Sequence, residues 1–354
     1  MKILFTHELF PPDMAGGGEK LVLHLTQHLT KKGHSVKVLT SGDPKIKSYG
    51  GVETVRIPVN RYLMNILALP TILRHARDAD IIQTSSGNMA LPSYIVAKLL
   101  NKPICCWVHH IFGKYWRDVR GPVIGRIFEV VERLALARNF DYYVFENTSS
   151  KKIGAELGIP AKKMKMIAPG IDYKKFAPKR KIKRTDSVLF VGNFSMDEPT
   201  IKTKGVKYLM EAAEMLPNVQ FNIVGNFKKK IRQPKNVTML GVVKQKKLIE
   251  LYKSAGAFVC SSLNEGFGLV LLEAMATGCA IVSTINIGQV GKKVKPKDSK
   301  AIADAIEFYI NNPAKARADG NKNRKLAQRY TWNKFYDNFE KLHKNLNKRL
   351  NKWY

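Results

Sequence analysis

The feature that most constrains the fold is a repeated alternation of short apolar runs, typical of strands, with longer stretches of helical periodicity. The first cycle reads KILFTHELFPPDMAGGGEKLVLHLTQHLTKKGHSVKVLTSG. Residues 2–6 form a buried-strand run, Leu21, Leu25 and Leu29 recur at helical spacing, and Gly33 ends the helix. This alternation predicts an α/β protein in which a parallel sheet is covered by helices.

The alternation runs twice along the chain. After residue 168 a polar stretch with two prolines and a cluster of bases interrupts it, and it begins again at SVLFVGNF. A chain of 354 residues also exceeds the size at which a single core usually stops growing. We therefore expect two Rossmann-like, doubly wound domains that face a cleft at the carboxyl ends of both sheets. The expected bounds are 1–168 for the first domain, 169–186 for the linker, 187–330 for the second domain and 331–354 for a basic C-terminal helix.

The chain is strongly basic. Lys and Arg total 60 against 28 Asp and Glu, which gives a formal net charge of +32. Such an excess attracts phosphate groups, whether on a soluble ligand, a nucleic acid or an anionic membrane. Since no basic run carries interleaved aromatic residues in the arrangement of a known reader, we do not expect nucleic acid as a partner.

The cysteines and the apolar segments indicate the compartment. Four cysteines lie in apolar runs without metal-ligand spacing, which predicts reduced, buried thiols in a cytoplasmic protein. No uncharged apolar segment reaches the roughly 18 residues that could span a bilayer. If a membrane is involved, we expect the protein to lie on its cytoplasmic face. The four thiols are Cys105, Cys106, Cys260 and Cys279.

Two local patterns could bind phosphate or metal. Gly16, Gly17 and Gly18 follow the first strand and open a helix, so their N–H groups could meet a phosphate or a sugar, although a tight turn alone would need the same glycines. Asp78 and Asp80 form a D-x-D pair, but they lead into an apolar strand and are expected to be solvated. No other cluster has metal-ligand spacing, so we expect chemistry without a metal or a cofactor.

The segment SSLNEGFGLVLLEAMATG places two glutamates around a very apolar run. Gly266 and Gly268 let the backbone approach a ligand, and the helix that opens after them favours negative charge at its start. Glu265 lies in the loop before that helix, and Glu273 lies one to two turns into it. A buried Glu273 must either accept hydrogen bonds from hydroxyl groups or bind a proton and become neutral. A solvated glutamate in the first turns of a helix is the alternative.

Taken in order, these motifs resemble those of family 4 retaining glycosyltransferases of the GT-B fold. The resemblance covers nearly the whole chain. It includes HELFPPDMAGGGEK at the start, IAPGIDYKKFAP between the domains, NEGFGLVLLE as an E-x7-E segment and RYTWNKFYDNFEKL at the end. It implies that the closing helix crosses back to the first domain, and that the donor is a nucleotide diphosphate sugar.

The resemblance also implies roles for individual residues. Glu265 would contact the hydroxyls of the donor sugar, Glu273 would accept hydrogen bonds from the ribose, and Lys204 would neutralise the diphosphate leaving group. His109 would lie beside the donor sugar in the first domain. The remaining donor-binding residues would be Gly16 and Gly17 for the diphosphate, Gly241 and Val242 near the base, and Gly266, Phe267, Gly268, Leu269 and Val270 for the sugar and diphosphate.

The chain departs from the family pattern at several positions. Asn193 stands where an arginine usually partners the diphosphate lysine, and the insert SMDEPTIKT follows it. His110 replaces a frequent aspartate, Pro169 replaces a common asparagine, and the segment after Thr284 is shorter than usual. Lys202 or an arginine elsewhere could supply the missing charge.

The acceptor is expected to lie mostly on the first domain. KYWRDVRGPVIGRIFEVVERLALARNF mixes aromatic, apolar and Arg residues as an interfacial helix does, which favours a glycan that is lipid-linked or held at an anionic membrane surface. An ordinary amphipathic core helix would show a similar pattern. Another GT-B enzyme, such as an epimerase or a phosphorylase, and a basic nucleic-acid-binding protein stay open as alternatives. The sequence leaves the base, the sugar, the acceptor and the oligomeric state undetermined.

Overall fold

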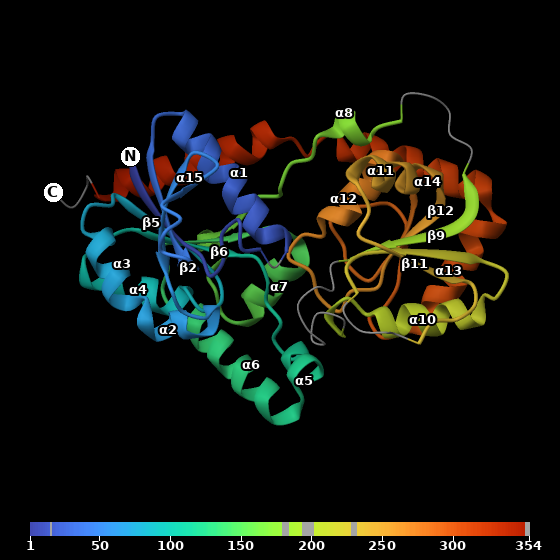
Figure 1. The fold of residues 1–354 in the computed structure, drawn as a ribbon, viewed down its shortest axis with the longest axis horizontal. Helices are drawn as coiled ribbons and strands as arrows, with labels where there is room; N and C mark the ends of the chain where they lie inside the picture. Colours follow the sequence, from blue (N-terminus) through green and yellow to red (C-terminus); the bar gives the residue numbers. More distant parts are fainter. Residues whose placement is uncertain (15, 179–183, 193–201, 228–231, 351–354) are drawn as a thin grey trace. The chain divides into compact units, whose positions relative to one another are not determined.

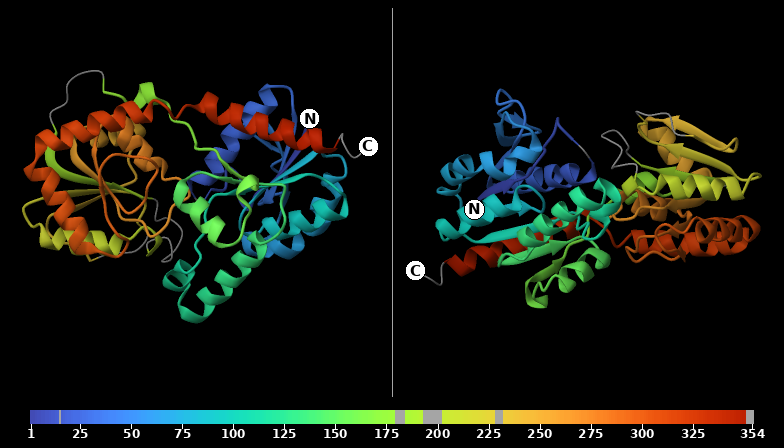
Figure 2. Two further views of the ribbon diagram at one scale, coloured as in Figure 1. Left: turned by 180° about the vertical axis from the view of Figure 1, so that it is seen from behind. Right: turned by 90° about the horizontal axis from the view of Figure 1, so that it is seen from below.

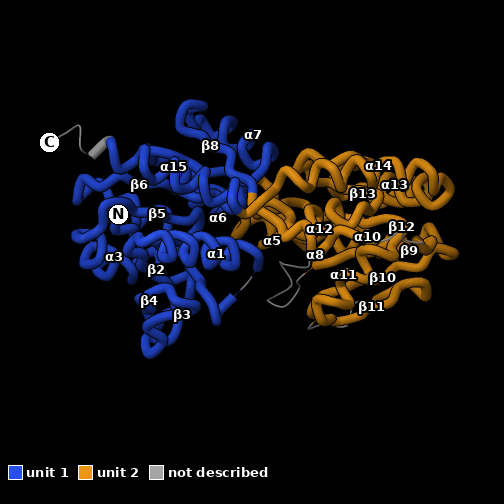
Figure 3. Tube along the Cα trace, turned by 90° about the horizontal axis from the view of Figure 1, so that it is seen from above, with its two compact units in different colours: residues 1–113, 126–168, 333–354 blue, residues 114–125, 169–332 orange. Residues whose placement is uncertain are grey.

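The computed structural model describes residues 1–14, 16–178, 184–192, 202–227 and 232–350. The chain forms two compact units, coloured separately in Figure 3. Unit 1 contains residues 1–113, 126–168 and 333–354, and unit 2 contains residues 114–125 and 169–332. The chain thus enters unit 2 twice, briefly at residues 114–125 and then at residues 169–332, and returns to unit 1 near its end. The asparagine at position 193 and most of the insert after it lie outside the described residues.

Unit 1 is built on an eight-stranded sheet in the order β3-β4-β2-β1-β5-β6-β7-β8. All neighbouring strands are parallel except β3, which pairs antiparallel with β4 at one edge. The predicted parallel sheet is therefore confirmed, with a short edge strand added. The strands are β1 (Lys2–Thr6), β2 (Ser35–Ser41), β3 (Ser48–Tyr49), β4 (Val52–Ile57), β5 (Ile81–Ser85), β6 (Ile104–Val108), β7 (Tyr142–Phe145) and β8 (Met164–Met166).

Helices cover both faces of this sheet (Figure 1). Helices α1 and α15 lie together on one face, where the rings of His28 and Tyr336 stack with centroids 4.0 Å apart. Helices α2, α3, α4 and α6 supply the core on the other face. The helices are α1 (Gly17–Lys31), η1 (Arg61–Leu63), α2 (Met64–Leu67), α3 (Leu69–Ala76), α4 (Ala90–Leu99), α6 (Pro122–Leu136), α7 (Thr148–Glu156), η2 (Ala161–Lys163) and α15 (Trp332–Leu350).

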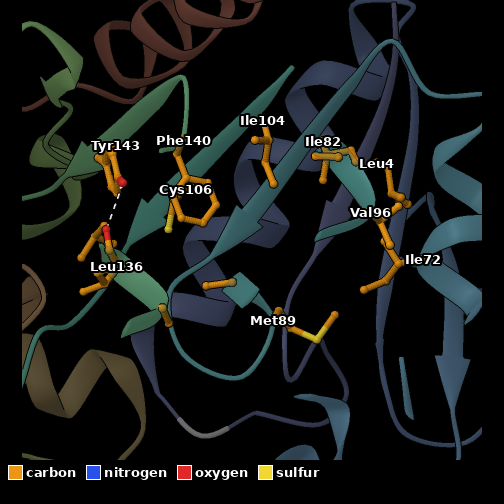
Figure 4. Close-up of a cluster of buried hydrophobic side chains, with 14 of the residues drawn as sticks. Leu4, Ile72, Ile82, Met89, Val96, Ile104, Cys106, Leu136, Phe140 and Tyr143 are labelled. Atoms are coloured by element: carbon orange, nitrogen blue, oxygen red, sulfur yellow. Dashed lines mark hydrogen bonds between the residues drawn. The ribbon is translucent and has the colours of Figure 1, made fainter. Parts of the chain in front are cut away.

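The core of unit 1 follows from the two-residue period of its strands. Leu4 on β1, Ile82 on β5 and Cys106 on β6 point to the same face of the sheet, where they pack in the cluster drawn in Figure 4. At the edge of this cluster the hydroxyl of Tyr143 donates to the carbonyl of Leu136 at 2.9 Å. This bond gives the buried phenol the partner that its polar oxygen needs.

The opposite face of the sheet holds the last helix. Residues one position along the same strands, Phe5 and Trp107, contact His343 and Phe339 of α15 at ring-centroid distances of 6.2 and 4.6 Å. Figure 2 shows α15, in red, along this side of unit 1. The prediction that the closing helix crosses back to the first domain is confirmed, because its apolar face finds its core there.

Unit 2 repeats the architecture with a six-stranded, fully parallel sheet in the order β11-β10-β9-β12-β13-β14. Helices α10 and α13 lie on one side and α11, α12 and α14 on the other (Figure 1). The strands are β9 (Thr185–Val191), β10 (Gln220–Val224), β11 (Val237–Gly241), β12 (Ala255–Cys260), β13 (Ala280–Ser283) and β14 (Lys292–Lys293). The helices are α5 (Tyr115–Arg120), α8 (Tyr173–Phe176), α10 (Val206–Met215), α11 (Gln245–Ser254), α12 (Leu269–Thr277), α13 (Ser299–Asn311) and α14 (Pro313–Ala327).

Each sheet has one switch point, where the strand order reverses. It lies between β1 and β5 in unit 1 and between β9 and β12 in unit 2. Loops that leave neighbouring strands in opposite directions open a crevice at this point, and ligands of such sheets bind there. The carboxyl ends of these strands therefore locate the candidate site within each unit.

The four cysteines are buried and free, as predicted. Burial raises the pKa of the Cys105 and Cys106 thiols, which keeps them protonated. Within the described part of the chain, no helix combines the length and the apolar character needed to cross a bilayer.

Candidate active site

In unit 2 the site begins with Glu265, which lies in the loop between β12 and α12. Its carboxylate is buried, and Oε1 accepts hydrogen bonds from Ser262 Oγ at 2.7 Å and from Lys204 Nζ at 2.5 Å. The sequence interpretation assigned Lys204 and Glu265 to different parts of one donor. The structure brings them together, at the carboxyl end of the switch-point strand β12.

A tight junction between two loops holds Lys204 in place. Ser261 Oγ donates to the carbonyl of Lys204 at 3.0 Å, and the N–H of Leu263 donates to the carbonyl of Thr203 at 2.8 Å. Gly205 has a φ of +65°, and a Cβ at this position would lie 2.0 Å from the carbonyl oxygen of Ser261. Only glycine permits so close an approach.

Lys204 remains a cation in this setting. Burial alone would lower the pKa of its amine, but the attraction of the Glu265 carboxylate and the hydrogen bond to it outweigh burial and raise the pKa above its ordinary value. A partly buried, charged lysine is thus held at the carboxyl end of the sheet.

The start of α12 supplies backbone donors beside this pair. Gly268 is the N-cap with φ +88° and makes no side-chain cap, so the first N–H groups of the helix, those of Leu269 and Val270, have no acceptor within it. Phe267 is buried, with its ring 5.7 Å from that of Tyr330. The N–H groups and the helix dipole favour an anion at this end of α12.

Glu273 has a protein partner that the sequence did not reveal. Tyr252 on α11 is fully buried, and its hydroxyl donates to Glu273 Oε2 at 2.9 Å. Burial, and then the negative charge of Glu273 and the hydrogen bond to it, raise the pKa of Tyr252 well above its usual value, so the phenol stays a donor. The half-buried carboxylate therefore has a hydroxyl donor, which is the first of the two outcomes expected from its apolar surroundings.

Gly241 and Val242 lie at the end of β11, two strands away from β9. Gly241 has φ +67°, and Val242 is 77% exposed. Among the described residues, no hydrogen bond joins either of them to Lys204 or Glu265. Their proposed place near the base remains a prediction.

In unit 1 the candidate site surrounds His109, which directly follows β6. His109 is 7% exposed, and its Nδ1 lies 2.9 Å from Oε1 of Glu146. The same oxygen accepts a hydrogen bond of 2.8 Å from Trp107 Nε1. The ring of His7, which follows β1 at the switch point, lies 5.3 Å from that of His109. Burial, reinforced by repulsion from His109, lowers the pKa of His7 to about 4.

The glycine segment lies against the same histidine. A Cβ on Gly18 would be 3.5 Å from His109 Nδ1, so the helix start and His109 are in contact. The predicted glycine loop is shorter than expected, because Gly17 and Gly18 already belong to α1 and only Gly16 is the N-cap. The N–H of Gly16 donates to Glu19 Oε2 at 2.9 Å. The Glu19 carboxylate thus already accepts a hydrogen bond from one of the N–H groups that the sequence interpretation assigned to the diphosphate.

The D-x-D pair, Asp78 and Asp80, lies where the chain enters β5. Asp80 Oδ2 accepts a hydrogen bond of 2.8 Å from the backbone N–H of Lys2, and Asp78 is exposed. Both lie at the entry to β5, as the solvated interpretation expects. Within the described ranges, no group of three or more His, Cys, Asp and Glu side chains is placed so that it could hold a metal ion.

Sequence reasoning missed three side chains that hold the candidate residues: Ser262, Tyr252 and Glu146. Of these, Glu146 carried a signal. It directly follows β7, and Glu265 likewise comes a few residues after β12. An acidic residue after a buried strand lies at the edge where parallel sheets bind ligands. Ser262 and Tyr252 carried none, since hydroxyl residues are common beside strands and in helices.

Comparison with known proteins agrees with this geometry. Residues 15–175 match the family model described as Glycosyltransferase Family 4, and residues 185–312 match the model described as Glycosyl transferases group 1. The chain is 24% identical to phosphatidyl-myo-inositol mannosyltransferase of Mycobacterium leprae, over 90% of each chain. It is 25% identical to a subunit of phosphatidylinositol N-acetylglucosaminyltransferase of Arabidopsis thaliana, over 86% of this chain and 71% of that one.

A solved structure shares the fold. Anabaena HepE in complex with UDP-glucose superposes with a TM-score of 0.73, at 18% identity, over 98% of this chain and all of that one. Two parallel-sheet units, each with candidate residues at its switch point, define the class of the protein: a glycosyltransferase of the GT-B fold. The two family models together cover most of the chain, and the protein belongs to glycosyltransferase family 4. Neither the epimerase or phosphorylase alternative nor the nucleic-acid-binding one is favoured by these matches.

Proposed function

We propose that the protein transfers a sugar from a nucleotide diphosphate sugar to a glycan or lipid-linked acceptor, with retention of the anomeric configuration. The observation that carries this proposal is the Lys204–Glu265 pair beside the uncapped start of α12. It combines a partly buried cation, backbone N–H donors at the helix start and a carboxylate, which are the groups needed to bind a diphosphate and the hydroxyls of a sugar. Anabaena HepE, solved with UDP-glucose, supports this class of donor.

The reaction needs charge stabilisation more than acid–base chemistry. Departure of a nucleoside diphosphate leaves an oxocarbenium-like sugar and a growing negative charge on the leaving group. Lys204 and the N–H groups of Leu269 and Val270 stabilise that charge. As the diphosphate becomes the partner of Lys204, the carboxylate of Glu265 is released to accept hydrogen bonds from the sugar.

The proposal also gives a role to Glu273 of unit 2 and to residues of unit 1. Glu273, oriented by the Tyr252 hydroxyl, accepts hydrogen bonds from the ribose. Gly16 and Gly17 meet the diphosphate once Glu19 gives up the N–H of Gly16. His109 lies beside the transferred sugar. Gly241 and Val242 lie near the base, and Gly266, Phe267 and Gly268 let the backbone approach the sugar.

Retention follows if the acceptor attacks from the face that the leaving group vacates. The departing phosphate oxygen then takes the acceptor proton, and no side chain forms a covalent bond to the sugar. The resemblance to family 4 supports this step. Neither a metal nor a cofactor is required, so EDTA should leave the rate of transfer unchanged.

The test begins with the donor. Thermal-shift measurements with UDP-, GDP- and ADP-sugars should single out one nucleotide, because a ligand at a hundred times its Kd stabilises the folded state by about 2.7 kcal/mol. Sugar transfer or donor hydrolysis is then measured for that donor. Glu265→Gln should lower turnover strongly while the Tm changes little, because Ser262 can still donate to the amide oxygen. Unchanged turnover in this variant would refute the proposed contact of Glu265 with the donor sugar.

We further propose that the acceptor is held at a membrane surface, and helix α6 supports this proposal. Six aliphatic side chains on α6 are between 43% and 73% exposed, and at helical spacing they form one stripe. The exposed Arg126 and Arg133 border that stripe. An apolar face flanked by arginines suits the headgroup region of an anionic bilayer. The six residues are Val123, Ile124, Ile127, Val130, Val131 and Leu134.

Flotation with anionic and neutral vesicles tests this surface. The wild type should float with anionic vesicles, and the double variant Ile127→Gln, Leu134→Gln should not, with an unchanged Tm because both side chains are exposed. Met215→Gln is the control, since Met215 is 49% exposed on α10. A concentration-dependent dimer that is lost in the double variant, without vesicle binding, would show that a second copy covers the stripe instead.

A further inference from the structure

Glu146 is a buried acid in direct contact with His109. It is 3% exposed and directly follows β7, on the neighbouring strand to β6. Its Oε1 atom accepts from Trp107 Nε1 at 2.8 Å and lies 2.9 Å from His109 Nδ1. A buried carboxylate is destabilising unless it is paired, and here Trp107 and His109 are the groups that pair with it.

The contact decides which nitrogen of His109 carries the proton in the neutral ring. An ionised carboxylate can only accept, so Nδ1 must donate to Glu146, and Nε2 is then left as the acceptor. Nε2 is buried and has no hydrogen-bond partner among the described residues. A buried nitrogen without a partner is destabilising, and a ligand group that donates a hydrogen bond at this position would remove that cost.

The carboxylate itself is held by the last helix of the chain. The indole ring of Trp107 lies between the His109 ring, at 4.5 Å, and the Phe339 ring of α15, at 4.6 Å. Phe335 adds a second contact at 5.8 Å, and both phenylalanines are fully buried. Helix α15 thus fixes the indole, and the indole N–H fixes the carboxylate that orients His109.

We propose that Glu146 is a positioning residue for glycosyl transfer, which holds His109 with its proton on Nδ1 and presents Nε2 to the donor sugar, and that α15 braces this arrangement through Trp107. The proposal rests on the proposed role of His109. Its structural part, the tautomer, is independent of that role and is measured separately.

Glu146→Leu is the central variant because leucine is similar in size to glutamate and removes the acceptor. Trp107 and His109 both contact Oε1, so a glutamine oxygen at that place could still accept from both, whereas leucine leaves Nδ1 without an acceptor and lets the His109 proton move to Nε2. Selective ¹⁵N-histidine NMR of the resting protein reads the tautomer, with the His109 signals assigned from a His109→Asn spectrum. We expect the Nδ1–H form in the wild type and the Nε2–H form in Glu146→Leu.

Kinetics give the second readout. A wrong tautomer of an active-site histidine can cost up to about 10⁴-fold in kcat, and we expect Glu146→Leu to lower kcat at least about tenfold with little change in the donor KM. Glu146→Asp, which keeps the carboxylate, should lose less activity. Combining Glu146→Leu with His109→Ala should lower kcat no further than His109→Ala alone. Glu156→Gln, at an exposed position at the end of α7, is the control.

Several outcomes would overturn the proposal. One is a Glu146→Leu protein that keeps the Nδ1–H tautomer, and another is one that changes tautomer but keeps full kcat. If Glu146→Leu does not fold, Trp107→Phe removes the indole N–H, keeps a ring against Phe339 and should give a smaller loss of kcat. Full activity of His109→Ala would refute the proposed role of His109, and with it the catalytic part of this proposal, while the tautomer measurement would still report on Glu146.

Discussion

Lys204 Nζ and Glu265 Oε1 lie 2.5 Å apart, although the two residues are 61 positions apart in the sequence. Each was assigned to a different part of the donor, and in the structure each neutralises the other. The pair stabilises a partly buried cation and a buried carboxylate. In the proposed mechanism, donor binding exchanges this ion pair for contacts to the diphosphate and the sugar.

Replacing Lys204 by methionine should reduce catalysis more than stability. We expect kcat to fall roughly 10²- to 10³-fold, since one charged group that stabilises the leaving group is lost. The free energy of unfolding should fall by about 1–3 kcal/mol, because the buried Glu265 carboxylate loses the cation that pairs with it. Steady-state kinetics and urea unfolding measure both effects. Lys207→Met is the control, since that side chain is 77% exposed on α10; an equal loss of kcat there would contradict a specific role for Lys204.

Tyr252→Phe should weaken donor binding without a large effect on kcat. The variant removes the hydroxyl that orients Glu273, so we expect a higher donor KM and a loss of stability of about 1 kcal/mol. Tyr309→Phe is a matched control, because the Tyr309 hydroxyl donates to Asp319 at the same distance of 2.9 Å in the same unit. It should lose similar stability and keep the wild-type KM. Equal KM values in the two variants would argue against a ribose contact by Glu273.

Comparing Gly205→Ala with Gly241→Ala should separate two causes of destabilisation: the strain of a positive φ, and a steric clash of the new Cβ. The two glycines have nearly the same φ, +65° and +67°, so alanine costs about 1–2 kcal/mol of strain at either position. Only at Gly205 would the new Cβ meet backbone, at 2.0 Å from the Ser261 carbonyl, whereas nothing lies within 4 Å at Gly241. We expect Gly205→Ala to lower the Tm much further, as measured by calorimetry. Equal Tm values would show that the junction of the two loops is able to relax.

Stability should fall as the pH is lowered below neutrality. Burial, with repulsion from His34, lowers the pKa of His343 to about 3, and its Nε2 contacts Gln83 Oε1 at 2.9 Å. Between an unfolded pKa of about 6.5 and the folded value, the unfolded chain binds more protons. The contribution of His343 is thus complete above about pH 6.5 and is lost toward pH 3, at about 1.4 kcal/mol per pH unit.

Urea unfolding at about pH 7.5 and about pH 5 measures this dependence. His343→Gln should lower the stability at the higher pH but reduce the difference between the two conditions, because it removes one titrating group. Glu340, on the same helix, opposes the effect of burial on His343. A pH difference unchanged in His343→Gln would assign the acid sensitivity to other groups, such as His7.

Much of the fold could be predicted from the sequence because its signals are local. A strand run such as residues 2–6, or the spacing of Leu21, Leu25 and Leu29, depends only on neighbours within a few turns. The same holds for the glycines that precede α12. The start of α1 was less predictable, since three successive glycines leave the first helical residue open until the helix packs against His109.

The sequence by itself determined the two cycles of strands and helices and the order of the family 4 motifs, and through them the class of reaction. Only the tertiary structure decided which side chains meet: Ser262 and Lys204 on Glu265, Tyr252 on Glu273, and Glu146 on His109. The physical reason is that periodicity and caps are set over a few residues, whereas these contacts depend on which strands become neighbours. Strand order arises from packing the whole sheet, and no short segment encodes it.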